Sequence, residues 1–179
     1  MAAMIKIRSI LKSFKDDESA SATIEFVMLI PIVIWIVFSV LEAGWLMTQK
    51  TMLNRGVNMA VRDLRIGATP NPTHATIKTD ICNYAGILRN CQTALHLEMV
   101  GFDNPISSAA ATCVDRSTAV EPVVNWLLGS RTVPEVMILR ACFVVDPLIP
   151  GAGMGALLPT DSTGAFHMVS YSSFVNEPL

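Results

Sequence analysis

An uncharged apolar run near the N-terminus constrains the fold of this chain more than any other feature. The run from Phe26 to Leu41 is sixteen residues long and is bounded by Glu25 and Glu42. A helix of this run spans roughly 24 Å, slightly less than the apolar core of a bilayer. Residues 23–47 together are long enough, and they leave both carboxylates near an interface, where a charge costs less than at the bilayer centre. The sequence therefore predicts one membrane-spanning helix.

Basic residues precede the apolar run and indicate its orientation. Four of them lie close together: Lys6, Arg8, Lys12 and Lys15. Because short basic segments beside a membrane span stay in the cytoplasm, residues 1–20 are predicted to form a cytoplasmic leader and residues 48–179 to lie on the opposite side. A cleavable signal peptide is the alternative, but the run is too long for one and no small-x-small site follows it closely.

The apolar helix is predicted to continue beyond the membrane as a stem. Apolar residues recur at helical spacing from Leu53 to Leu64, and Gly67 follows as a C-cap. A helix over residues 21–66 would be roughly 69 Å long, more than a membrane span requires. The predicted organisation is a cytoplasmic leader (1–20), a transmembrane and stem helix (21–67) and a head domain (68–179).

The head domain is predicted to be α+β. Thr73 is a candidate N-cap for a helix over residues 74–88, and residues 122–128 are predicted as a short helix. Gly- and Pro-rich residues 147–164 are predicted as a loop. Three β-prone runs cover residues 94–102, 136–145 and 166–175, the first with an imperfect alternation of two. A helix backed by an antiparallel sheet of about three strands accounts for these elements.

Four cysteines follow the apolar run: Cys82, Cys91, Cys113 and Cys142. An even number in a small exported domain indicates disulfides, with three possible connectivities. We favour Cys82–Cys91 and Cys113–Cys142. Two residues nine apart in one helix lie roughly 13.5 Å apart, too far for a disulfide, so the helix must end before Cys91. Four buried thiols remain the alternative.

No residue pattern predicts catalysis, a metal site or a cofactor. The glycines of residues 151–155 lack the Lys-Ser/Thr pair of a phosphate loop. Three histidines lack metal-ligand spacing: His74, His96 and His167. Three aspartates are too far apart in the sequence to predict a calcium site: Asp115, Asp146 and Asp161. The formal net charge of −2, without clusters of basic and aromatic residues, does not indicate a nucleic-acid partner. Neither an enzyme nor a small-molecule substrate is predicted.

A carboxylate and a proline stand at the start of the apolar helix. Glu25 lies four residues after Ser21, so a cut between Ala20 and Ser21 would make it the fifth residue of the product. An uncut chain would instead carry Glu25 as an ordinary interfacial residue of a signal anchor. Pro31 removes a hydrogen bond to the carbonyl of Val27 and is predicted to kink the helix.

This N-terminal pattern resembles the TadE-like family, the pseudopilins of tight-adherence (Tad/Flp) pili, a branch of type IV filaments. The segment that carries the resemblance reads Ala20-Ser21-Ala22-Thr23-Ile24-Glu25-Phe26-Val27-Met28-Leu29-Ile30-Pro31. Similar features recur at Glu42-x-Gly44, from Asn58 to Gly67, at Leu139–Cys142 with Asp146-Pro147, and at Asn176-Glu177-Pro178. The resemblance is specific over residues 20–67 and weaker beyond.

The resemblance implies a structural or assembly subunit of a Tad-type pilus, a minor pilin-like protein that supports filament biogenesis and adherence. It implies a single-pass protein of the bacterial inner membrane with a periplasmic C-terminus, cut between Ala20 and Ser21 by a prepilin peptidase. Family members usually carry Gly before the cut, where this chain has Ala20.

The implied partners are other pilin subunits and the pilus assembly machinery, with assembly roles for Glu25 and Phe26. In a filament, the carboxylate of Glu25 would neutralise the α-amine of Ser21 in a neighbouring subunit, because buried charges tend to be paired. The competing interpretation is a signal-anchored periplasmic binding module or enzyme unrelated to pili. A mature N-terminus at Ser21 would favour the pilin, and an intact Met1 would favour the competitor.

Overall fold

The computed structural model describes residues 18–69, 72–104, 113–117, 124, 126, 134–149, 153 and 157–176. The leader up to residue 17, most of the helix predicted over residues 122–128 and the last residues of the chain lie outside these ranges. By its internal contacts the chain divides into two compact units, residues 1–41 and residues 42–179. We call them the first and the second unit and describe each by itself.

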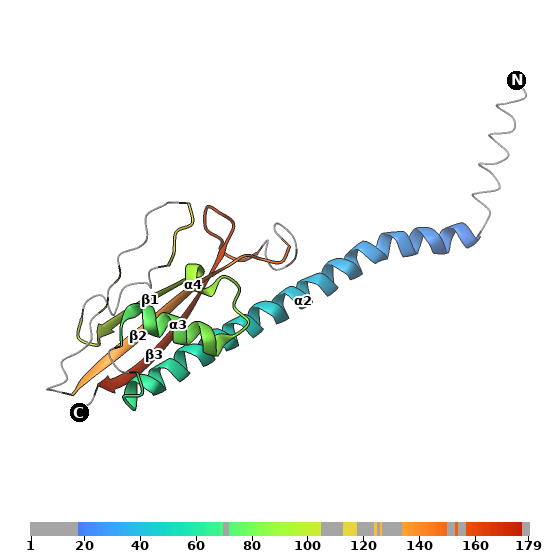
Figure 1. Cartoon of the computed structure of the whole chain (residues 1–179). Coiled ribbons are helices and arrows are strands. Elements are labelled where there is room, and N and C mark those ends of the chain that lie inside the picture. Colours follow the sequence, from blue (N-terminus) through green and yellow to red (C-terminus); the bar gives the residue numbers. More distant parts are fainter. Residues whose placement is uncertain are drawn as a thin grey trace, which may run out of the picture. The chain divides into compact units, whose positions relative to one another are not determined.

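One long helix, α2 (Glu18–Arg65), contains the apolar run and the predicted stem (Figure 1). It differs from the predicted range 21–66 by three residues at its start and one at its end. Gly67 has a φ of 68°, a left-handed conformation that costs glycine little. The amide of Ala68 then donates to the carbonyl of Asp63 at 3.0 Å, which satisfies one of the last carbonyls of the helix.

The second unit contains a three-stranded antiparallel sheet of β1 (Leu95–Gly101), β2 (Glu135–Val145) and β3 (Phe166–Asn176). The strand order is β1-β2-β3, so β2 lies in the centre. Cα partners include Glu98 with Arg140 across β1 and β2, and Arg140 with Tyr171 across β2 and β3. All three strands lie within one residue of the predicted runs, and the predicted α+β fold class is confirmed.

Helix α3 (His74–Ala85) begins as the sequence predicts and ends earlier. Thr73 and Thr76 form a capping box, in which each side-chain oxygen accepts from the other residue's backbone amide, at 3.2 and 2.9 Å. The helix ends at Ala85 rather than at residue 88, because Gly86 takes a left-handed φ of 63°. A short helix that the sequence did not predict, α4 (Cys91–Ala94), follows and leads directly into β1.

The core of the second unit lies where α2 and α3 pack with one face of the sheet (Figure 1). Each element contributes fully buried apolar side chains, among them Leu53 and Val57 of α2, Ile77 and Ile81 of α3, and Leu95, Leu97, Leu139 and Phe143 of the sheet. The apolar stripe predicted from Leu53 onward is thus the face of α2 that the head covers.

The two helices approach each other closely at Gly56. A Cβ at this position would lie 2.7 Å from the carbonyl oxygen of Ile81 and 3.2 Å from the Cβ of Ala85. About two turns further along α2, the hydroxyl of Tyr84 donates to the carboxylate of Asp63 at 2.6 Å. This hydrogen bond raises the pKa of Tyr84, because the phenolate would face a carboxylate. A glycine and a polar contact therefore fix the spacing of α2 and α3.

Both faces of β1 are buried. Leu95, Leu97 and Met99 face the helices, and the alternate positions His96 and Glu98 are 4% and 1% exposed. On this second face, Arg140 of β2 pairs with Glu98 at 2.9 Å, both side chains being almost fully buried. The imperfect alternation of the strand is explained by this burial, since a strand covered on both sides does not need a uniformly polar face.

Candidate functional site

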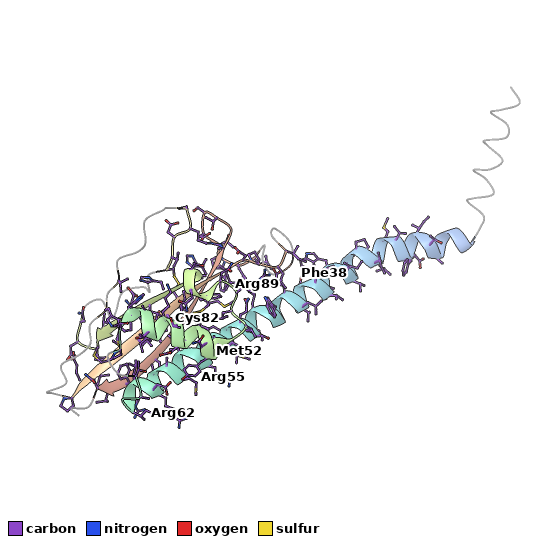
Figure 2. The ribbon with its side chains drawn as sticks, viewed as in Figure 1. Phe38, Met52, Arg55, Arg62, Cys82 and Arg89 are labelled. Atoms are coloured by element: carbon purple, nitrogen blue, oxygen red, sulfur yellow. A yellow bond between two sulfur atoms is a disulfide. The ribbon has the colours of Figure 1, made fainter. Side chains whose placement is uncertain are left out.

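The apolar helix of the first unit is exposed on every side. Every described side chain from Ala22 to Leu41 is exposed or half-buried, including the large residues Phe26 and Trp35. Phe38 is another of them and is labelled in Figure 2. Within the described residues α2 is the one helix long and apolar enough to cross a membrane. A helix that is apolar all round needs an apolar surrounding, and a membrane provides one. This segment is therefore a candidate membrane anchor.

The polar groups inside this run are few. The hydroxyl of Ser39 donates to the carbonyl of Trp35 at 2.8 Å, which satisfies it within its own helix. Glu25 and Phe26, the residues predicted to act in assembly, lie in the helix and are both exposed. Glu25 is thus a carboxylate carried on an otherwise apolar surface, accessible to a partner of opposite charge.

The predicted processing site lies at the start of α2. The backbone of Ala20 and Ser21 is helical, and α2 continues through Pro31 without a break. Cleavage after Ala20 and the kink expected at Pro31 both stay predictions.

Glu42 differs from the expectation of a second carboxylate at a membrane interface. In the second unit it is 1% exposed, and its Oε1 accepts from the backbone amide of Ile149 at 3.3 Å. About two turns along α2, Gln49 is buried as well, and the ammonium of Lys50 donates to the carbonyl of Val169 in β3. The polar residues that follow the apolar run therefore contact distant parts of the second unit, Ile149 and β3.

Two disulfides cross-link parts of the second unit that are separated in the sequence. Cys82 of α3 is bonded to Cys91 of α4 with 5.7 Å between their Cα atoms, and Cys113 is bonded to Cys142 of β2 with 5.2 Å. This is the pairing favoured from the sequence, and no cysteine is free. The first disulfide closes the turn after Gly86, and the second attaches the connection between β1 and β2 to the second face of the sheet.

In the structure, charged residues from three loops lie close enough to change one another's pKa values. Arg116 donates to both carboxylate oxygens of Asp146, at 2.5 and 3.0 Å, and this lowers the pKa of Asp146. Asp161 accepts from the hydroxyl and amide of Thr163 and from the amide of Ala165, and these hydrogen bonds lower the pKa of Asp161.

Asp115 belongs to the same region, since the charge of Asp161 acts to raise the pKa of both Asp115 and Asp146. The hydroxyl of Ser117 outweighs this effect on Asp115, whose pKa is lowered. His167 contacts Asp161 at 3.2 Å. Each carboxylate thus has its own donor, and the described residues contain no group of three that could hold a metal ion.

Two polar sites of the second unit had no signal in the sequence. One is the buried pair of Glu98 and Arg140, whose partners are brought together only by the register of β1 on β2. The other is a cavity of about 550 Å³ lined by residues of α2, of the turn before α4 and of the end of β2. Gln49 and Arg89 are among them, forty residues apart in the chain.

The chain was compared with known protein families, curated proteins and solved structures. The family model described as TadE-like protein matches residues 20–62, from the residue before the predicted cut to within a few residues of the end of α2. No curated protein and no solved structure matches the chain. The resemblance seen in the sequence is confirmed over this segment, and it is consistent with a protein of Tad pili: residues 20–62 are a TadE-like segment.

Proposed function

We propose that this chain is a minor pilin-like subunit of a Tad-type pilus that supports filament biogenesis and adherence, and that it is not an enzyme. The observation that carries the proposal is the coincidence of the TadE-like match with an apolar helical segment, residues 22–41, that is exposed all round and bears a single carboxylate, Glu25. A surface of this kind suits a subunit that is stored in a membrane and later packs against other helices.

In this proposal residues 1–20 stay in the cytoplasm and the head domain lies in the periplasm. A prepilin peptidase cuts between Ala20 and Ser21, and the released α-amine of Ser21 pairs with Glu25 of a neighbouring subunit. Phe26 packs beside this pair, and other pilin subunits and the assembly machinery are the partners. The two disulfides support an exported head domain, since disulfides persist in oxidising compartments.

The test is the substitution Glu25→Gln, which keeps the shape of the side chain and removes its charge. In the membrane the variant should accumulate normally, because a costly charge near the apolar core disappears. In a filament the α-amine of Ser21 would lose its counter-charge, and breaking a buried pair from one side costs about 3–5 kcal/mol. That is more than about a hundredfold in an association constant, so filaments counted by electron microscopy should be lost.

Glu18→Gln is the matched control. It makes the same chemical change seven residues earlier, on the leader that the peptidase would remove, and should leave filament number unchanged. Sequencing the N-terminus of the purified wild-type protein should give Ser21. If Glu25→Gln gives normal membrane levels and normal filaments, Glu25 is an interfacial residue and the assembly mechanism is wrong.

A further inference from the structure

The cavity of the second unit is built from four segments that are distant in the sequence, one of which contributes Arg116. Its volume is about 550 Å³, within the range of about 300–1,000 Å³ usual for ligand pockets. Trp45 and Gln49 line it from α2, Arg89 and Asn90 from the turn before α4, and Asp146 from the residue after β2. Polar and apolar groups therefore line one partly open cavity.

Gln49 contributes a hydrogen-bond acceptor to this cavity. Its side chain is 5% exposed, and its Oε1 has no hydrogen-bond partner among the described residues. Buried amide oxygens are normally paired, because leaving one unsatisfied costs free energy. An N–H or O–H group of an occupant in the cavity would satisfy it.

Arg89 contributes a positive charge that the cavity does not neutralise. The other guanidinium in the lining, that of Arg116, is matched by Asp146, to which it donates twice. Arg89 is exposed at the turn before α4 (Figure 2) and forms no ion pair with a described residue. The planar fork of a guanidinium suits a carboxylate, which can accept two parallel hydrogen bonds.

The half-buried indole of Trp45 adds an apolar surface to the same lining. Indole rings provide large apolar contact areas and are favoured at sites of recognition. An occupant must then combine a carboxylate, an N–H donor and an apolar part. A peptide segment with an acidic side chain contains all three, and its backbone repeats the N–H donor at every residue.

We propose that this cavity binds a short acidic peptide segment. The carboxylate pairs with Arg89, a backbone N–H donates to Oε1 of Gln49, and an aliphatic part packs on Trp45. The chemistry follows from the cavity alone. The source of the segment, a partner subunit, rests on the function proposed above.

The proposal is tested by fluorescence anisotropy on the full chain in detergent micelles. The probes are two labelled, N-acetylated and C-amidated tetrapeptides, Gly-Asp-Glu-Leu and its neutral counterpart Gly-Asn-Gln-Leu. The acidic peptide should bind more tightly than the neutral peptide by on the order of tenfold, because only the acidic peptide can form a charge-assisted pair with Arg89. Arg89→Gln should abolish this preference, and Gln49→Leu should weaken binding of both peptides.

Arg55→Gln is the control, because Arg55 is an exposed arginine on α2 that does not line the cavity (Figure 2). The variant should bind like the wild type. Equal binding of the two peptides, or equal losses in Arg55→Gln and Arg89→Gln, would overturn the proposal. Competition by free glutamate at the same concentrations as the peptide would assign the site to an amino acid and refute a peptide ligand.

This experiment separates the proposal from the pilin function. It needs no filament, so Glu25→Gln protein should bind the acidic peptide as the wild type does. Absent peptide binding with lost filaments in Glu25→Gln would reject only the peptide site. Normal peptide binding with intact filaments in Glu25→Gln would reject only the assembly mechanism.

Discussion

Gly56 and Gly44 lie on the same helix in opposite surroundings, which gives a matched pair of substitutions. A Cβ at Gly56 would lie 2.7 Å from a backbone oxygen of α3, and one at Gly44 would meet nothing within 4 Å. Alanine favours a helix by about 1 kcal/mol over glycine at either site. At Gly56 overpacking against a backbone atom should outweigh this gain and lower the free energy of unfolding by about 1–3 kcal/mol.

Urea unfolding of the full chain in detergent micelles, followed by tryptophan fluorescence, measures both variants. Gly56→Ala should shift the midpoint down, whereas Gly44→Ala should leave it unchanged or raise it. A Gly56→Ala protein as stable as Gly44→Ala would mean that α2 and α3 do not approach each other as closely as the structure indicates.

For some single residues, the sequence did not predict the environment that the structure shows. Gln49 follows the apolar run as an ordinary polar residue, and Arg140 interrupts a β-prone run without a visible reason. Their environments depend on distant segments: Gln49 lines a cavity together with the end of β2, and Arg140 meets Glu98 through the strand register. Local patterns do not specify such pairings, so the cavity and the buried ion pair could not be predicted.

Elements were more predictable than individual contacts. The long helix, the capping box at Thr73 and the three strands have local causes, namely hydrophobic periodicity and capping chemistry. The errors were local too. The end of α3 was placed three residues late because Leu88 extended the apparent pattern past Gly86, and α4 is too short to leave a periodic signal.

The two disulfides stabilise different connections and should differ in strength. In the chain-entropy account, a cross-link constrains the unfolded chain more when it closes a longer loop. Sequence separations of 9 and 29 residues correspond to about 2.6 and about 3.6 kcal/mol. Replacing Cys113 and Cys142 by alanine should therefore lower the urea midpoint more than replacing Cys82 and Cys91.

The control for this comparison is the wild-type protein under reducing and non-reducing conditions. Mass spectrometry of the non-reduced protein should show two intramolecular disulfides, and full reduction should cost more than either pair of substitutions. Four free thiols in the non-reduced protein would contradict the structure. A larger loss from the Cys82–Cys91 pair would show that native packing of α3, rather than loop length, sets the order.

At the scale of the molecule, one chain joins two units with opposite solvent requirements. The first unit exposes apolar side chains on all sides of its helix, whereas the second buries a core on one face of its sheet and an ion pair on the other. The sequence predicted the apolar helix because the uncharged run is long, and it placed a boundary at residue 67 rather than after residue 41, where the two units divide. It did not predict that Glu42 and the polar residues after it are held by the head.

Orientation in the membrane is a property of the whole molecule. Basic residues before a span stay in the cytoplasm, and disulfides persist in oxidising compartments, so we predict from both features that the second unit lies outside. A phosphatase that is active only outside the cytoplasm, fused after Leu179, should be active. The same reporter fused after Asp17, before the apolar helix, should be inactive.

Replacing the basic residues of the leader by glutamate should lower the activity of the Leu179 fusion, because the positive charge retains the leader in the cytoplasm. An inactive Leu179 fusion that is still present in the membrane would reverse the orientation and would remove the proposed head domain from the compartment where a pilus subunit assembles.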